Sequence, residues 1–375
     1  MSTRARRWAF AGLVAAALLA IYMTSLRQGY EALLALLDLV DRTPPVALDI
    51  RPAARRSEIN FEVETRRYSA DLYQPTDHVL AGIVFIPGAA PAGKEDPRVI
   101  NFATIFARCR FAVLVPDIIA LRELKLLPET ARDVADALTY LLSRQDLAPQ
   151  GRGGVVTSSV GIGPALLGVL EPSLSSRVRF FLSIGGYYDL PRLLTYFTTG
   201  HYQAHGVSLN DHPYEYGKWV YALSNASRLE DPREREVFST LARRKLEDPK
   251  APVDDLLAAL GPAGRQIYAF ITNTDPSRSP VLMSKLPPRM YAHISELNLA
   301  ARDLSDLDTR FILVHGFEDA TIPYGESIAL AQALPPHKAN LFLLHGLVHV
   351  DVEPGIMDGL KMWRAIYTLL SERYL

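Results

Sequence analysis

The amino-acid sequence predicts an α/β fold, with a doubly wound, mostly parallel sheet and a helical cap insertion. Short β-branched or aromatic runs recur along the chain, amphipathic segments lie between them, and one long helix-rich segment interrupts this alternation. Parallel strands are buried on both faces and therefore read as apolar runs, and strands that alternate with helices build a parallel sheet. The order of these elements argues against an all-α or all-β protein.

The composition agrees with a large folded protein of 375 residues. Hydrophobic residues make up 49% of the chain, enough for a sizeable core, and 22% are charged, which argues against disorder. The formal net charge of -1 gives no basic field that could hold a polyanion, so we expect no nucleic-acid partner. Cys109 is the sole cysteine, which excludes an intrachain disulfide and a cysteine-rich metal site.

Residues 1–26 have the pattern of a membrane anchor or signal segment. Arg4, Arg6 and Arg7 precede an uncharged apolar run from Trp8 to Met23. The run is shorter than the roughly 20 residues of a spanning helix, and no A-x-A-like cleavage site follows it directly. We expect an uncleaved anchor; a cleaved secretory signal and a buried helix are the alternatives.

Arginines on the N-terminal side of such a segment keep that end in the cytoplasm. The rest of the chain would then face outward, and we expect it in the bacterial periplasm, or secreted if the segment is cleaved. Residues 27–59 follow as a stalk or packing helix and linker. Tyr30 to Asp41 has helical spacing, and Pro44 and Pro45 stop the helix.

The predicted core comprises residues 60–188 and 309–375. It begins with an alternating antiparallel strand pair between Asn60 and Tyr73. Six apolar runs then predict parallel strands: Val79 to Ile86, Phe111 to Val115, Gly154 to Thr157, Val178 to Leu182, Arg310 to Val314 and Asn340 to Leu344.

Two amphipathic segments predict helices that pack on this sheet. One carries its apolar stripe from Val134 to Leu142, and the other spans Pro354 to Leu375. Residues 189–308 separate the fourth and fifth parallel runs and contain helical pieces broken by Pro, Gly and Asn. We expect this segment to form a cap above the C-terminal edge of the sheet, where open α/β sheets bind ligands.

The joint Thr157-Ser158-Ser159-Val160-Gly161 between a strand and a helix predicts a nucleophilic serine. A nucleophile on a sharp turn needs small neighbours, because the turn brings its backbone against adjacent elements. Gly161 follows Ser159 at the required spacing, so we prefer Ser159 to Ser158. Thr157 stands where the G-x-S-x-G pattern has its first glycine, so the match is imperfect, and a serine-rich strand end is the alternative interpretation.

A serine hydroxyl attacks only when a base accepts its proton and an acid orients that base. The segment HGFED, which ends at Asp319, follows one predicted strand, and HGLVH, which ends at His349, follows the next. Ser159, Asp319 and His349 thus occur in the order nucleophile, acid, base. Glu318 as the acid and His345 as the base are the alternatives. Because His345 directly ends a strand, we expect it to form a local hydrogen bond.

These motifs resemble the α/β-hydrolase superfamily, and the resemblance covers the predicted core without most of the cap. His315 to Pro323 is similar to the family's H-G-x-x-D-x-x-V-P acid loop, and His345 to His349 is similar to its G-x-x-H loop. The approach from Leu297 to Gly316 resembles that of prolyl-oligopeptidase-like esterases and peptidases. The resemblance implies that Asp319 orients the base and that His349 is the base.

Acyl transfer also needs N–H donors for the developing oxyanion. The N–H of Val160, the residue after the nucleophile, is the first candidate. The segment Pro87-Gly88-Ala89-Ala90 follows the strand AGIVFI and resembles the family's H-G-x-x loop, with proline in place of histidine. We assign the second donor to Ala89, with Ala90 as an alternative and an ordinary glycine-containing turn as the other interpretation.

The expected activity is hydrolysis of a carboxylic ester through an acyl-enzyme, without a metal or another cofactor. The partner would be a small-molecule ester or acyl substrate, and the aromatic residues of the cap favour an apolar group if they face the site. A peptidase, a lipase or an acyltransferase could use the same triad. Outside the enzymes, a catalytically silent binding module is the alternative, favoured by Thr157 and Pro87.

Overall fold

The computed structural model describes residues 23–40, 49–348, 351–352 and 355–374. Most of the targeting segment predicted for residues 1–26 lies outside this part of the chain, and so does the predicted base His349. Among the described residues, no helix combines the length and the apolar character that crossing a membrane requires.

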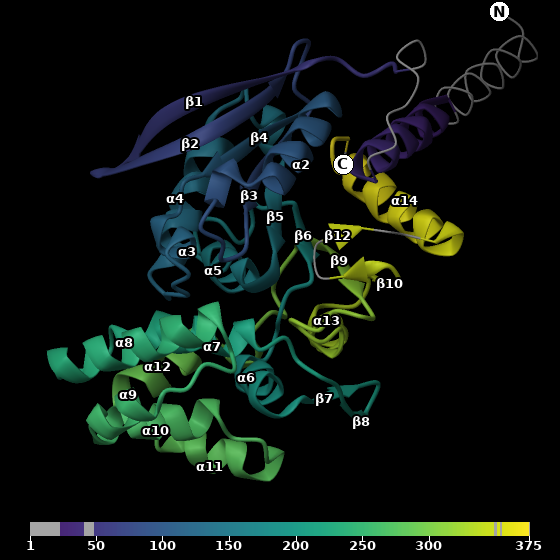
Figure 1. Ribbon diagram of the computed structural model, residues 1–375. Helices are drawn as coiled ribbons and strands as arrows, with labels where there is room; N and C mark the ends of the chain where they lie inside the picture. Colours follow the sequence, from purple (N-terminus) through teal and green to yellow (C-terminus); the bar gives the residue numbers. More distant parts are fainter. Residues whose placement is uncertain (1–22, 41–48, 349–350, 353–354, 375) are drawn as a thin grey trace, which may run out of the picture.

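An eight-stranded sheet forms the centre of the molecule (Figure 1), in the order β1-β2-β4-β3-β5-β6-β9-β10. β2 pairs antiparallel with β1 and with β4, and all other neighbours are parallel. The strands are β1 (Ala54–Val63), β2 (Arg66–Pro75), β3 (Ala81–Ile86), β4 (Phe111–Pro116), β5 (Gly153–Ser158), β6 (Phe180–Ile184), β9 (Arg310–Gly316) and β10 (Ala339–Leu344). This sheet confirms the predicted doubly wound architecture and all six predicted parallel strands.

The chain reverses its direction of travel across the sheet at β3. The strand that follows β3 in sequence, β4, lies on one side of it, and β5 lies on the other. The carboxyl ends of β3 and β5 therefore border the crevice at which open α/β sheets bind their ligands. The segments that leave these two ends begin at Pro87 and Ser159.

Helices cover both faces of the sheet. α4 (Thr130–Ser143) and α5 (Ile162–Val169) pack on one face, and α2 (Pro97–Arg108) and α14 (Ile356–Ser371) pack on the other. The structure confirms the two predicted helices, α4 and α14. Two further helices of the core are α3 (Ile119–Arg122) and α13 (Gly325–Ala333).

A helix of residues 23–39 precedes the sheet and lies along α14 (Figure 1, purple and yellow). Trp363 donates its indole N–H to the carbonyl of Gly29 at 2.8 Å. Glu31 forms a buried ion pair with Arg373 at 2.7 Å and a second one with Arg110 at 3.3 Å. This N-terminal helix is therefore part of the packed structure.

The segment between β6 and β9 forms the cap, which lies beyond one end of the sheet (Figure 1). Its helices are α6 (Leu190–Thr199), α7 (Tyr216–Ala226), α8 (Pro232–Glu247), α9 (Asp254–Ala259), α10 (Pro262–Ile271), α11 (Ser279–Ser284) and α12 (Pro288–Leu297). A hairpin of β7 (His201–Ala204) and β8 (Val207–Asn210) follows α6. After β10, the short strands β11 (Leu347–Val348) and β12 (Asp351–Val352) pair antiparallel.

Candidate active site

Ser159 occupies a sharp turn between β5 and α5. Its φ angle is +54°, in the left-handed region that residues other than glycine seldom adopt, and its side chain is nearly buried. A Cβ atom at Gly161 would lie 2.7 Å from the carbonyl oxygen of Pro87 and 2.8 Å from Oγ1 of Thr157. Only glycine fits at position 161, and Thr157 packs directly beside it in place of a smaller residue.

The loop after β3 lies against this turn. The N–H of Gly88 donates a hydrogen bond to Oγ of Ser158 at 3.2 Å. A Cβ atom at Gly88 would lie 2.9 Å from Cβ of Ser159, so the close approach of the two segments requires glycine. The hydroxyl of Ser158 is thus engaged with the backbone, whereas Ser159 lies at the turn itself.

Both predicted oxyanion donors line the same cavity as Ser159. Within the described part of the chain, the N–H of Ala89 has no hydrogen-bond acceptor. Val160 lies in the first turn of the helical segment that continues into α5, where backbone N–H groups lack partners inside the helix. Ala89, Val160 and Ser159 thus line one cavity, as the predicted oxyanion site requires.

Asp319 lies in the loop after β9, and its side chain is buried. Its Oδ1 accepts hydrogen bonds from the N–H groups of Thr321 at 2.8 Å and Ile322 at 3.0 Å. These bonds fix the orientation of the carboxylate, and Nε2 of His315 lies 3.5 Å from Oδ2. Thr321 lines the same cavity as Ser159, so the loop that holds Asp319 opens on that cavity.

The alternative acid and base pair with each other at the surface. Nδ1 of His345 lies 2.6 Å from Oε1 of Glu318, and about half or more of each side chain is exposed. The buried ring of His315 contacts Oγ of Ser327 at 2.7 Å and the carbonyl of Ile322 at 2.8 Å. Both histidines thus have hydrogen-bond partners, and the partner of His345, Glu318, comes from the loop after β9 rather than from a neighbouring residue in the sequence.

The strands β11 and β12 flank position 349, and the backbone of β11 contacts the acid loop. A Cβ atom at Gly316 would lie 1.7 Å from the carbonyl oxygen of Leu347, an approach that only glycine permits. The side chain of Leu347 is buried and lines the cavity that contains Ser159. The chain therefore reaches this cavity two residues before His349, which itself lies outside the described residues.

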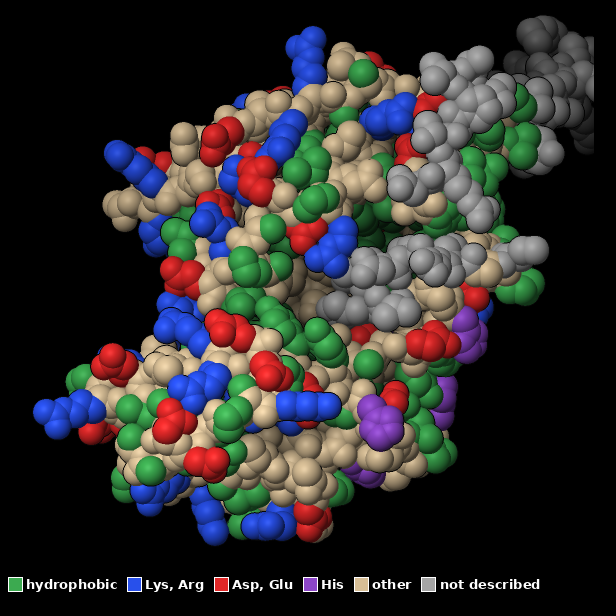
Figure 2. All heavy atoms as spheres, in the orientation of Figure 1, with side chains coloured by type: hydrophobic (Ala, Val, Ile, Leu, Met, Phe, Trp, Pro, Cys, Tyr) green, Lys and Arg blue, Asp and Glu red, His purple; other side chains and the backbone are tan. Residues whose placement is uncertain are grey.

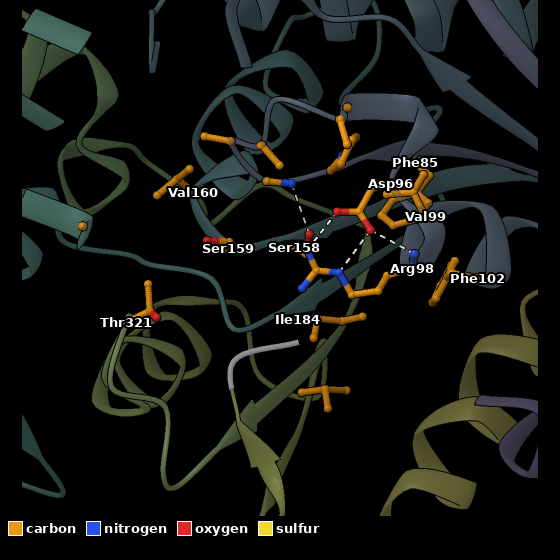
Figure 3. A pocket seen from close by; sticks show the side chains of 18 of the residues that line it. Phe85, Asp96, Arg98, Val99, Phe102, Ser158, Ser159, Val160, Ile184 and Thr321 are labelled. Carbon is orange, nitrogen blue, oxygen red and sulfur yellow. Dashed lines mark hydrogen bonds and ion pairs between the residues drawn. The ribbon is translucent and has the colours of Figure 1, made fainter. Parts of the chain in front are cut away.

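Residues of these loops line one cavity of about 750 Å³. In Figure 3, Ser158 and Ser159 lie in its middle, with Val160 and Thr321 on one side and Phe85, Val99 and Phe102 on the other. Figure 2 shows hydrophobic side chains at the junction between the sheet and the cap. Most of the lining is apolar, and the cap contributes Leu190, Leu193, Phe197, Tyr214, Tyr216 and Tyr221.

The charged side chains of the cavity wall, in the part of the chain that the structure describes, are Asp96 and Arg98. Asp96 caps α2 by accepting the N–H of Arg98 at 2.9 Å, and the two side chains form an ion pair at 2.8 Å. The hydrogen bond from Arg98 lowers the pKa of Asp96. The described residues contain no group of three His, Cys, Asp or Glu side chains that could hold a metal ion.

The cap is bonded to the loop that carries Asp319. The carbonyl of Ala320 accepts hydrogen bonds from the N–H of Tyr214 at 2.8 Å and from the hydroxyl of Tyr196 at 3.1 Å. Burial raises the pKa of the Tyr196 phenol, which keeps it neutral as a donor. The cap and the acid loop are thus positioned together.

Glu326, at the start of α13, makes a second connection to the cap. Its carboxylate accepts the N–H groups of Tyr188 at 2.8 Å and Asp189 at 2.7 Å, just before α6 begins. Complete burial raises the pKa of Glu326 to about 7, against the lowering effect of these two bonds.

Sequence reasoning missed several of these contributions. No pattern of charged residues in the sequence indicates that Glu326 accepts hydrogen bonds from the backbone just before α6. Helix α2 could have been found, because Asp96 followed by Pro97 is a helix-start pattern. The contact between Gly316 and Leu347 joins segments that no local pattern connects.

No protein-family description matches this chain, and no curated protein sequence matches it. Among solved structures, a Legionella pneumophila protein proposed to be a hydrolase is similar, with a TM-score of 0.54, 14% identity, and coverage of 91% of this chain and 95% of that one. A structure from a study of two fungal esterases of Rhizomucor miehei is also similar, with a TM-score of 0.49, 14% identity, and coverage of 91% of this chain and 88% of that one.

An esterase from Pyrobaculum calidifontis matches with a TM-score of 0.46, 15% identity, and coverage of 94% of this chain and 92% of that one. At such identities the likeness concerns the fold alone. For the Legionella pneumophila protein, the likeness in fold extends over most of both chains.

Proposed function

We propose that this chain, which has the α/β-hydrolase fold, is a serine hydrolase that cleaves a carboxylic ester through an acyl-enzyme. Ser159 would be the nucleophile, His349 the base and Asp319 the acid that orients the base. The observation that carries the proposal is the left-handed backbone of Ser159, at φ +54°, on a strand-to-helix turn in the cavity wall. Such strain in a residue other than glycine is typical of functional sites.

The proposed reaction proceeds in two stages. Oγ of Ser159 attacks the ester carbonyl carbon while His349 accepts the hydroxyl proton, and the N–H groups of Val160 and Ala89 bind the developing oxyanion. His349 then gives this proton to the leaving alcohol as the ester bond breaks. In the second stage, His349 takes a proton from water, the hydroxide attacks the acyl carbon, and the proton returns to Ser159 as the acid leaves.

The assignment of the acid rests on burial. Asp319 is buried and oriented by two backbone N–H groups, whereas Glu318 is exposed and paired with His345. A buried acceptor is better suited to hold an imidazole in one tautomer than a solvated side chain. Asp319 therefore remains our choice.

Peptidases, lipases and acyltransferases could use the same residues, and a silent binding module could retain the same fold. The mostly apolar cavity favours an ester with a neutral acyl group over a charged peptide. Against the silent module stands the left-handed backbone of Ser159, which is present although Thr157 replaces the first glycine of the motif.

We also propose that the protein is held at the membrane by residues 1–26, with the catalytic part outside the cytoplasm, or secreted if the segment is cleaved. The support is the sequence pattern, together with the exposed side chains of Met23 and Leu26 at the start of the N-terminal helix. Extraction of cell membranes with alkaline carbonate tests this. The protein should stay in the pellet, and release of the full-length chain would contradict anchoring.

The catalytic proposal is tested by hydrolysis of p-nitrophenyl butyrate. Ser159→Ala, His349→Ala and Asp319→Asn should each lower kcat/KM by about a thousandfold or more, with the far-UV circular dichroism unchanged. Ser173→Ala, which alters an exposed serine, serves as the matched control and should match the wild type. A folded wild type without ester hydrolysis would favour the silent module, and equal activity of Ser159→Ala would refute the nucleophile.

A further inference from the structure

The cavity continues past Ser159 into the layer between the sheet and the helices α2 and α14. The side chains that line this inner part come from three groups of elements. They are Phe85, Leu182 and Val314 of the sheet, Val99, Phe102 and Phe106 of α2, and Met362, Ala365, Ile366 and Leu369 of α14. All of them are buried and apolar. We call this part of the cavity the inner compartment.

The N-terminal helix contributes to the same cavity through Leu39. Its docking on α14 depends on contacts that lie away from the catalytic loops, chiefly the hydrogen bond from Trp363 to Gly29 and the buried pair of Glu31 with Arg373. The N-terminal helix therefore packs against α14, which lines the inner compartment, and adds Leu39 to the wall of the cavity.

Residues of the cap line another part of the same cavity. Tyr214, which lines it, is 61% exposed, whereas Leu369 of the inner compartment is fully buried. In an acyl-enzyme mechanism the alcohol leaves first, while the acyl group stays bonded to the serine. The departing alcohol can leave past the exposed side chains of the cavity wall, and the retained acyl group can occupy the part that buried side chains line.

We propose that the inner compartment holds the acyl chain of the substrate, and that the enzyme prefers esters of medium- or long-chain aliphatic acids. The inference rests on the proposed ester hydrolysis by Ser159. Its physical basis is continuity, since Ser159 and the inner compartment line one cavity, and chemistry, since buried apolar side chains of the sheet, α2 and α14 line this compartment, with the ion pair of Asp96 and Arg98 at its border. Each methylene transferred from water to such a site increases binding by about fourfold.

The test is a series of p-nitrophenyl acetate, octanoate and dodecanoate, which differ only in the acyl chain. For the wild type, kcat/KM should rise by about a hundredfold or more from acetate to octanoate, because several methylenes enter the compartment. Ala365→Phe places a ring in the compartment and should lower the octanoate-to-acetate ratio by about tenfold or more. Met362→Ala enlarges the compartment and should shift the preference toward dodecanoate, which provides a second readout if Ala365→Phe does not fold.

Arg364→Ala is the matched control, because Arg364 lies on the exposed side of α14 and should leave the ratio unchanged. Hydrolysis of acetate at least as fast as octanoate, with ratios that neither cavity variant changes, would overturn the inference while leaving the ester hydrolysis in place. Failure of the wild type to cleave any of the three esters would instead refute the proposed function itself.

Discussion

Gly316 and Leu347 meet so closely that a single methyl group on Gly316 would overlap the carbonyl oxygen of Leu347. Gly316 ends β9 just before the acid loop, and Leu347 lies in the loop that leads to His349. Their contact therefore fixes how the loop of Asp319 lies against the segment that leads to the proposed base, His349. In a triad, displacements of about 1 Å can change the rate by about a hundredfold.

Gly316→Ala should therefore lower kcat/KM for an ester substrate by about a hundredfold, because Leu347 and the chain after it must move. Steady-state kinetics, with circular dichroism to verify folding, provides the measurement. Gly359→Ala in α14 is the matched control, since a Cβ atom there meets no other atom within 4 Å. The control should keep its activity and gain roughly 0.5–1 kcal/mol of stability from its better helix propensity. Full activity of Gly316→Ala would show that this contact does not position the base.

The hydrogen bond from Gly88 to Ser158 predicts a positioning role for Ser158. Ser158→Ala removes the acceptor that holds the loop of Ala89, so kcat should fall by about tenfold while KM changes little. The two parameters can be separated with p-nitrophenyl butyrate. A loss as complete as that of Ser159→Ala would instead identify Ser158 as the nucleophile, and an unchanged kcat would remove its positioning role.

The buried carboxyl group of Glu326 predicts a pH-dependent stability. Its pKa is raised from an ordinary value of 4.5 to about 7 by burial, so the folded protein holds this proton more tightly than the unfolded chain does. The stabilisation is complete below the ordinary pKa and is lost as the pH rises through 7. The free energy of unfolding of Glu326→Gln, relative to the wild type, should therefore increase by on the order of 3 kcal/mol between about pH 4.5 and about pH 8.

Urea denaturation at the two pH values measures this difference. The exposed Glu62→Gln serves as the control and should show no comparable change. A difference between Glu326→Gln and the wild type that stays constant across this range would contradict the assignment of the pH dependence to Glu326.

Because Glu31 forms a buried ion pair with Arg373, we expect the N-terminal helix to contribute to the global stability of the protein. Glu31→Ala leaves the buried guanidinium of Arg373 without its carboxylate, and the free energy of unfolding should fall by about 3 kcal/mol. Arg27→Ala removes the exposed partner of the same carboxylate and should change stability by less than about 1 kcal/mol. Thermal denaturation compares the two, and equal stability of Glu31→Ala and the wild type would show that the helix is not coupled to the core.

The sheet could be predicted from sequence because each parallel strand is buried on both faces and is read as an apolar run. Six such runs coincide with β3, β4, β5, β6, β9 and β10. The serine turn was also visible, because Gly161 must be small to fit beside Pro87 and Thr157. These features follow from local chemistry, which the sequence records directly.

The inner compartment and the bonds of Glu326 to the start of α6 could not be predicted in this way. Both depend on residues brought together from distant segments, such as Leu39, Phe102 and Ile366. Whether an apolar residue fills a core or lines a cavity depends on the packing of its neighbours, which a hydrophobic pattern does not encode. The same holds for Gly316, whose partner Leu347 comes from a different loop.

Treatment of the protein with a fluorophosphonate, with the adduct located by peptide mass spectrometry, shows whether Ser159 is the nucleophile. We expect one adduct, on Ser159, which is absent in Ser159→Ala and forms much more slowly in His349→Ala. An adduct on Ser158 or elsewhere, or a folded protein that forms none, would contradict this assignment.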